Sequence, residues 1–186
     1  MSEPAFTPAL TYEDYLDLPD DGRRYELVEG DLFVTAAPFI RHQSVLGNLH
    51  LLLAPFVREH RLGRTLLAPT DVLLSSTSVV QPDLVYVATA NQSRVLDAYV
   101  EGPPDLVVEI LSEGSRRYDE RTKKQLYEKF EVPEYGILDA ELETVKVYRL
   151  GLKGYGAATE LAAENGDRLT SPLFPGLAIE VAEIFA

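Results

Sequence analysis

The sequence predicts one α/β domain spanning residues 1–186. Two segments carry most of that prediction. Residues 105–112, DLVVEILS, form an almost continuous apolar run, which is typical of a central strand covered on both faces. Residues 42–60 place apolar side chains at helical spacing, which indicates a long amphipathic helix despite Pro55. No internal repeat, linker or low-complexity tract divides the chain.

The N-terminal part predicts a short helix followed by a hairpin. Thr11, with acidic residues two and three positions later, is typical of a helix start, so we expect a helix in 11–18 that the turn at 19–22 ends. Residues 23–37 alternate on either side of Glu29 and Gly30, which predicts two strands joined by a tight turn. The long helix is expected to begin after Pro38.

Later segments predict further strands and one more helix. The expected strands are 65–75 and 79–88, joined by a turn at 75–78, then 105–112, the hairpin of 134–141 and 144–150, and a strand near 158–162. A short helix or loop is expected over 91–99, a helix over 118–131, a turn at 164–167 and an apolar C-terminal strand region over 177–185.

The composition excludes several classes of protein. The chain has no cysteine, which excludes disulfides and thiolate metal sites and fits a reducing cytoplasm. The acidic start, residues 1–22, lacks the basic and apolar regions of a signal peptide, and no apolar run reaches the roughly 18 residues of a membrane span. We therefore expect a soluble cytoplasmic protein.

The charge is strongly acidic overall but unevenly distributed. A formal net charge of −13 repels nucleic acid at long range. Six of the seventeen basic residues nevertheless lie within fourteen positions: Arg116, Arg117, Arg121, Lys123, Lys124 and Lys129. One interpretation is a solvated helix with ion pairs along its face. The position of this cluster, directly after the 105–112 strand, favours a functional interpretation.

Two carboxylates lie in segments that are otherwise expected to be buried. Asp83 begins the apolar run LVYVA, and Glu109 lies inside LVVEIL. A buried carboxylate is costly unless it is paired, protonated or bound to a cation, and two such strands side by side would suit Mg²⁺. Two alternatives stay open: Asp83 simply terminates a strand, or Lys123 neutralises Glu109 without any metal.

Six short motifs follow one another along the chain: YELVEG at 25–30, RHQ at 41–43, VVQPDLVYV at 79–87, PDLVVEILS at 104–112, YD-x₃-K-x₃-Y at 118–127 and VPEYGILD at 132–139. In this order they resemble the bacterial "putative restriction endonuclease" family, long catalogued as a domain of unknown function. That family is similar to the PD-(D/E)XK nuclease superfamily. The resemblance covers the chain from about Thr11 to Phe185.

The resemblance implies a restriction-endonuclease-like α/β (α+β) fold, a mixed β-sheet flanked by helices, with a metal site on two adjacent strands. It assigns catalytic and metal-binding roles to Asp83 and Glu109, with the Ile110 carbonyl as a further Mg²⁺ or Mn²⁺ ligand. Leu111 stands where the superfamily pattern has lysine. The resemblance places that lysine at Lys123, on the following helix.

The spacing of the helix residues favours Lys123 over its neighbour. Asp119, Lys123 and Tyr127 lie four residues apart and so share one helix face, whereas Lys124 points about 100° away. The Lys123 ammonium is expected to orient the attacking water or stabilise developing charge. Lys124 remains the alternative.

Two further residues stand where the family carries similar ones. Glu26 is expected to complete the acidic site. His42 is expected either to contact phosphate or only to hydrogen-bond a carbonyl.

Together these observations predict a Mg²⁺-dependent endonuclease whose partner is nucleic acid, and we expect DNA rather than RNA. The residues expected to bind substrate are His42, Arg116, Arg117, Arg121 and Lys124. The competing function is a catalytically silent nuclease-like module for binding or assembly, which the net charge of −13 permits. We also expect a homodimer, because the apolar C-terminal strands offer surface for one.

Overall fold

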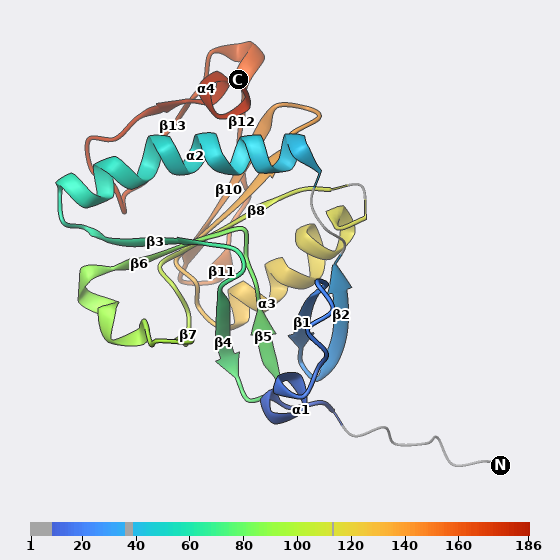
Figure 1. Cartoon of the computed structure of the whole chain (residues 1–186). Helices are drawn as coiled ribbons and strands as arrows, with labels where there is room; N and C mark the ends of the chain where they lie inside the picture. Colours follow the sequence, from blue (N-terminus) through green and yellow to red (C-terminus); the bar gives the residue numbers. More distant parts are fainter. Residues whose placement is uncertain (1–8, 36–38, 113) are drawn as a thin grey trace.

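The computed structural model describes residues 9–35, 39–112 and 114–186 (Figure 1). Within them, two mixed sheets and several helices form an α/β fold, which confirms the expected fold class, although strands expected in one sheet divide between two. No helix of the described residues is long and apolar enough to cross a membrane. The long helix begins at Ile40, which confirms the expected start after Pro38. The first eight residues of the acidic N-terminal segment lie outside the described residues.

The larger sheet has seven strands and carries most of the core. Its order is β11 (Gly154–Tyr155), β10 (Thr144–Gly151), β9 (Glu134–Asp139), β8 (Leu106–Ile110), β6 (Leu84–Ala88) and β3 (Gly63–Leu67), with β12 (Thr159–Ala162) also paired to β10. Only β8 and β9 pair in parallel here. β8 therefore lies in the middle of the sheet, as the apolar run predicted.

The smaller sheet has five strands and includes the predicted N-terminal hairpin. Its order is β2 (Asp31–Thr35), β1 (Arg24–Val28), β5 (Ser78–Val80), β4 (Asp71–Ser75) and β7 (Tyr99–Glu101). β1 and β2 turn at Glu29 and Gly30, whose φ angles of 52° and 88° are both left-handed. An added Cβ on Gly30 would also collide with Ala9, so glycine is required there.

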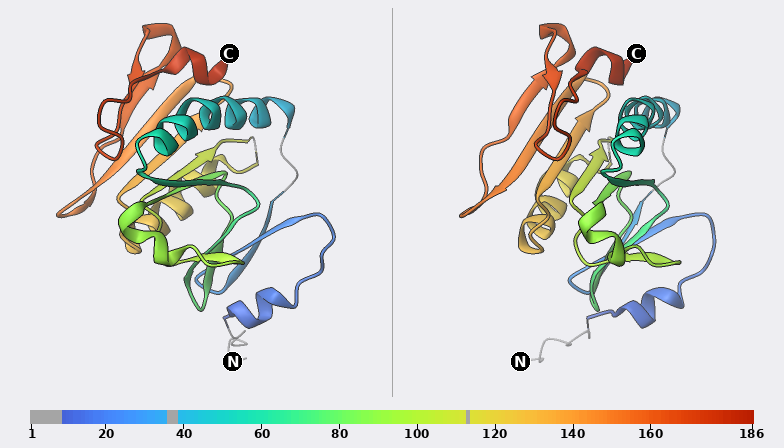
Figure 2. Two further views of the ribbon diagram at one scale, coloured as in Figure 1. Left: turned by 60° about the vertical axis from the view of Figure 1, so that its left-hand side comes forward. Right: turned by 90° about the vertical axis from the view of Figure 1, so that its left-hand side faces the viewer.

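Helices cover both faces of the seven-stranded sheet. The long helix α2 (Ile40–Glu59) lies on one face, and the π-helical turn η2 (Tyr118–Lys123) with α3 (Lys124–Lys129) lies on the other (Figures 1 and 2). The short helices are α1 (Tyr12–Leu16), α4 (Val181–Phe185), η1 (Thr89–Arg94) and η3 (Ala163–Asn165). The predicted cap of α1 is present, because Thr11 and Asp14 form a reciprocal capping box.

Alternation along β8 determines which side chains face each helix. Leu106, Val108 and Ile110 pack in the cluster that contains α2, whereas Val107 and Leu111 pack with Leu126 and Tyr127 of α3. Glu109 shares the second face, because successive side chains of a strand point to opposite sides. The sheet therefore directs the Glu109 carboxylate toward η2 and α3.

Several expected elements differ from the structure. Each of the long strands expected over 65–75 and 79–88 is broken at a proline, and its two halves enter different sheets. Proline has no amide hydrogen to donate to a sheet, so Pro69 and Pro82 end the strands. The structure also contains β7, where only a helix or loop was expected, and the helix of 118–131 begins as a π-helix.

The C-terminal segment also differs from expectation. It forms the short pair β13 (Arg168–Leu169) and β14 (Ile179–Glu180), followed by α4. Val181, Ile184 and Phe185 are buried and pack in the same core cluster as α2. The apolar surface on which the homodimer expectation rested is thus used within the chain, and the homodimer itself stays a prediction.

Candidate active site

The pairing of β6 with β8 brings the two predicted carboxylates together. Leu84 stands opposite Val108 in this antiparallel pair, and extending the register by one residue sets Asp83 beside Glu109. Both side chains are almost fully buried, each residue being 4% exposed. Asp83, one residue before β6, thus lies beside Glu109 of the adjacent strand β8, as the sequence predicted.

Glu109 is bound by the helix that crosses above it. Its Oε1 atom lies 2.8 Å from the Lys123 Nζ atom and accepts a 2.8 Å hydrogen bond from the Tyr127 hydroxyl. Asp119 Oδ1 lies 3.7 Å from the same ammonium, so residues 119, 123 and 127 share the face predicted from their spacing. The ion pair between Lys123 and Glu109, considered above as an alternative to a metal, is therefore present.

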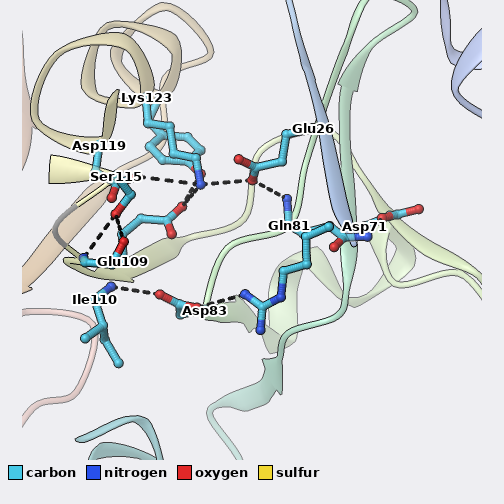
Figure 3. A network of polar contacts seen from close by, with 12 residues as sticks. Glu26, Asp71, Gln81, Asp83, Glu109, Ile110, Ser115, Asp119 and Lys123 are labelled. Atoms are coloured by element: carbon cyan, nitrogen blue, oxygen red, sulfur yellow. Dashed lines mark hydrogen bonds and ion pairs between the residues drawn. The ribbon is translucent and has the colours of Figure 1, made fainter. Parts of the chain in front are cut away.

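Glu26 reaches the same lysine from the other sheet. Its Oε1 atom lies 2.9 Å from Lys123 Nζ and accepts a 2.8 Å hydrogen bond from the main-chain amide of Gln81. The Gln81 side chain in turn donates to Asp71, which fixes the segment just before Asp83 (Figure 3). Figure 3 shows Lys123 between Glu109 and Glu26, so one ammonium joins the two sheets.

The Asp83 carboxylate is held by polar groups from three different elements. Its Oδ2 atom accepts from the Ile110 amide at 2.8 Å and lies 3.0 Å from His42 Nε2, at the start of α2. Its Oδ1 atom lies 3.2 Å from Arg24 Nη1, on β1. An ionised carboxylate only accepts hydrogen bonds, so the Nε2 atom of His42 carries the proton that it donates.

Burial and charge shift the acids of this site in opposite directions. Burial raises the pKa of Glu109 well above its usual value, against the lowering effect of Lys123. Burial likewise raises the pKa of Asp119 to about 6. Burial also opposes ionisation of Asp83, but hydrogen bonding by His42 and the Ile110 amide outweighs it and lowers that pKa. The pKa of Lys123 is raised, because burial is outweighed by Glu109 and Glu26.

These residues line a pocket of about 360 Å³ between the two sheets and the start of α2. Glu26, Asp83, Glu109, Asp119 and Lys123 are among its lining residues. Its remaining polar and apolar walls include Arg24, Phe33, Phe39, His42, Ser115 and Tyr118. The pocket is thus acidic inside and partly aromatic at its edge.

Three buried polar atoms on residues that line this pocket have no hydrogen-bond partner in the described part of the chain. They are Glu26 Oε2, His42 Nδ1 and the Tyr118 hydroxyl. Buried polar groups are almost always paired, so unsatisfied ones call for a ligand, ion or water. All three residues border one pocket, which makes this pocket the candidate site for a polar ligand.

The donor set suits a hard divalent cation. Four carboxyl groups, on Glu26, Asp83, Glu109 and Asp119, face the two permanent cations of Lys123 and Arg24. Among residues 9–35, 39–112 and 114–186, no group of three or more His, Cys, Asp or Glu side chains is arranged so that it could hold a metal ion. Mg²⁺ does not need such a group, since it usually binds through one or two carboxylates and keeps several waters.

The predicted substrate-binding residues divide into two groups. His42 lines the pocket, whereas the basic residues Arg116, Arg117, Arg121 and Lys124 are not among its lining residues. Arg116 pairs with Asp139 at 2.7 Å, and Lys124 lies over the Tyr148 ring. Lys123, by contrast, is buried and lines the pocket. The roles of all these residues stay predictions.

Sequence reasoning missed Arg24 and Tyr118 as pocket residues. The signal for Arg24 was available, because it lies two residues before Glu26 in a predicted strand and therefore faces the same side. Tyr118 could not be placed in the same way, because the π-helical start of its helix shifts the angular positions of its side chains.

Comparisons with known proteins address the fold and then the family. The fold is similar to the crystal structure of a putative nuclease belonging to DUF820 from Anabaena variabilis ATCC 29413, with a TM-score of 0.80, 18% sequence identity and coverage of 95% of this chain and 97% of that chain. No curated protein matches the chain. The Uma2 family, described as "Putative restriction endonuclease", matches residues 12–182, and the chain belongs to this family.

Proposed function

We propose that the protein is a Mg²⁺- or Mn²⁺-dependent endonuclease that hydrolyses phosphodiester bonds of nucleic acid, and we expect the nucleic acid to be DNA rather than RNA. The observation that carries this proposal is the convergence of Asp83, Glu109, Glu26 and Lys123 on one pocket that also holds unsatisfied polar atoms. Membership of a family described as "Putative restriction endonuclease" supports the same class of reaction.

The proposed division of labour follows from the contacts. Asp83 and Glu109 would hold the cation, with the Ile110 carbonyl as the further ligand. The bound cation would polarise the scissile phosphate and lower the pKa of a coordinated water. His42 and the Ile110 amide fix the Asp83 carboxylate by hydrogen bonds to Oδ2, so its orientation is set before the cation binds.

Lys123 supplies the fixed positive charge of the site. Its ammonium is held by Glu26 and Glu109, at 2.9 and 2.8 Å, and both carboxylates are themselves anchored by hydrogen bonds from Gln81 and Tyr127. A charge held in this way needs no reorganisation as negative charge develops on the phosphate. Glu26 is therefore a residue that positions Lys123, and its buried Oε2 atom has no hydrogen-bond partner in the described part of the chain.

The test is a cleavage assay on duplex, single-stranded and structured DNA and RNA with Mg²⁺ or Mn²⁺. We expect cleavage by the wild type and a loss of about 10²- to 10³-fold in Glu109→Gln. Glu160→Gln is the matched control, because Glu160 is an exposed glutamate on β12. Equal rates for Glu109→Gln and the wild type would reject the assignment of the site.

One observation favours the second candidate function, a nuclease-like binding module without turnover. Both oxygens of Asp83 are occupied by Arg24, His42 and Ile110, and Glu109 is already paired with Lys123. A site closed in this way can be stable without a cation. Absence of cleavage on the whole panel, in a protein that binds nucleic acid, would support this function and contradict the first.

A further inference from the structure

The two oxygens of Asp83 are held by groups of different mobility. Oδ2 is bound by a main-chain amide of β8 and by the largely buried ring of His42, at 2.8 and 3.0 Å. Oδ1 is bound by the guanidinium of Arg24, at 3.2 Å. The amide belongs to the central sheet and cannot move away, whereas the arginine head is carried by a long flexible side chain. Oδ1 is therefore the oxygen at which one partner can replace another.

Arg24 is placed so that its head can move. It begins β1 and lines the pocket, and its side chain is 21% exposed, compared with 5% for that of Asp83. Glu26, the other pocket residue of this strand, is bound through one oxygen to Gln81 and Lys123 and is 2% exposed. The strand thus combines a fixed acid with an arginine at the pocket's edge.

A divalent cation and this guanidinium cannot both occupy Oδ1. Two like charges a few ångströms apart repel strongly in a partly buried site, where screening by water is weak. Cation binding at Oδ1 therefore favours departure of the Arg24 head from Asp83.

We propose that Arg24 occupies the cation position on Asp83 in the free protein and, once a divalent cation displaces it, binds a phosphate of the substrate. This inference rests on the proposed function, because it concerns the same pocket and the same cation. It adds a residue that competes with the metal before substrate binds and recognises phosphate afterwards.

The chemistry of arginine suits both positions. Its planar guanidinium can bind a phosphate through two paired N–H donors, whereas it contacts Asp83 through Nη1 alone, at 3.2 Å. The pocket is otherwise rich in carboxylates and repels a polyanion. A displaced Arg24 would place a positive charge beside the bound cation, where a phosphate approaching it must lie.

Titration calorimetry with MnCl₂ alone tests the first half of the proposal, that Arg24 competes with the cation for Asp83. Arg24→Gln removes the competing charge, so we expect Mn²⁺ affinity to rise by about tenfold or more relative to the wild type. Arg24→Lys keeps the charge and should keep the wild-type affinity. Arg23→Gln is the matched control, because Arg23 is an exposed neighbour, 66% exposed in its side chain, that pairs with Asp21.

Binding of a fluorescent DNA oligonucleotide, measured with Ca²⁺ in place of Mg²⁺, tests the second half of the proposal, that the displaced Arg24 binds a phosphate. Arg24→Gln should bind it at least about tenfold more weakly than the wild type and Arg23→Gln. Tighter Mn²⁺ binding with weaker oligonucleotide binding supports the inference. Unchanged Mn²⁺ affinity in Arg24→Gln, beside a wild type that binds Mn²⁺, overturns the inference alone. Absence of Mn²⁺ binding in both proteins overturns the proposed function together with it.

Discussion

The central residue of the site is a fully buried lysine held by acids from two sheets. Lys123 is 4% exposed and contacts Glu109, Glu26 and Asp119. A buried ion pair contributes little net stability, but removing one partner leaves the others as uncompensated buried charges. Lys123 therefore has two separable effects, one on the stability of the site and one on its chemistry.

The two neighbouring lysines should differ in both effects. We expect Lys123→Ala to lose about 3 kcal/mol of unfolding free energy, because Glu26 and Glu109 lose their counter-ion. At saturating Mg²⁺ and a temperature where the variant is folded, its cleavage rate should fall about 10²- to 10³-fold.

Lys124→Ala is the matched control for Lys123→Ala. Lys124 pairs with Glu128 at 3.9 Å with its side chain 24% exposed, so its removal should cost less than about 1 kcal/mol and leave turnover largely unchanged. Urea unfolding and initial rates measure the two effects separately. Equal rates in the two variants, or a larger loss in Lys124→Ala, would contradict the role of Lys123.

Asp119 should make stability depend on pH in an unusual direction. Burial raises its pKa from 3.8 to about 6, although Lys123 lowers it, so the folded protein keeps a proton that the unfolded chain has lost. Its contribution to stability therefore falls as the pH rises from about 4 to about 6. Asp119→Asn removes this effect, and the stability of the variant relative to the wild type should grow through that window by up to about 3 kcal/mol.

Thermal unfolding of both proteins at several pH values measures the Asp119 effect. The unfolding must be measured without divalent cations, because a bound cation would itself favour the ionised carboxylates. A difference between variant and wild type that stays constant from pH 4 to pH 7 would show that Asp119 ionises normally.

At the scale of elements, the sequence predicted the strands of the site but not all of their boundaries. The positions of Asp83 and Glu109 within two apolar runs were sufficient to predict that the two carboxylates lie together. Alternation and the antiparallel register fix which face of the sheet each side chain occupies. The division of two long strands between two sheets was not predictable from periodicity, which is the same in both sheets. The π-helical start at Tyr118 likewise leaves no periodic signal in the sequence.

Contacts between elements bring together residues that spacing along the sequence could not connect. Glu26 reaches Lys123 only because β1 pairs with β5 in the smaller sheet, and that pairing joins residues about fifty positions apart. Arg24 contacts Asp83 for the same reason. The resemblance grouped Glu26, Asp83 and Lys123 but not Arg24, and the distances among all four depend on how the two sheets pack together.

The contact of α3 with β8 should be measurable through one hydroxyl. The Tyr127 hydroxyl is buried and donates to Glu109 Oε1 at 2.8 Å, so Tyr127→Phe should lose about 1–3 kcal/mol of unfolding free energy. Tyr148→Phe, on the half-buried face of β10, should change it by no more than about 0.5 kcal/mol. Equal losses in urea unfolding would mean that the hydroxyl does not support Glu109.

At the scale of the whole molecule, the net charge of −13 and the acidic pocket oppose binding of a polyanion. Association must therefore rely on local positive charge, from Arg24 in the pocket or from exposed arginines such as Arg117 and Arg121 of the basic cluster. Binding of this kind is weak and strongly screened by salt.

Affinity for a DNA oligonucleotide should thus fall steeply as NaCl is increased. Replacing Arg117 and Arg121 by glutamine should weaken binding and reduce the slope of log affinity against log salt by about 0.9 for each phosphate that is no longer neutralised. Arg168→Gln is the control, because Arg168 is exposed and pairs with Glu180 on the C-terminal strand pair. Binding that is tight and insensitive to salt would contradict this account.

The most direct test of the central claim is whether the pocket holds a divalent cation through Asp83. Thermal unfolding of the wild type with increasing MnCl₂ should show a rising melting temperature, since a cation at about 100 times its Kd adds about 2.7 kcal/mol to stability. Asp97→Asn, which changes an exposed aspartate, should show the same rise, and Asp83→Asn should lose it. A melting temperature that does not respond to Mn²⁺ in the wild type, or that rises equally in Asp83→Asn, would contradict the account.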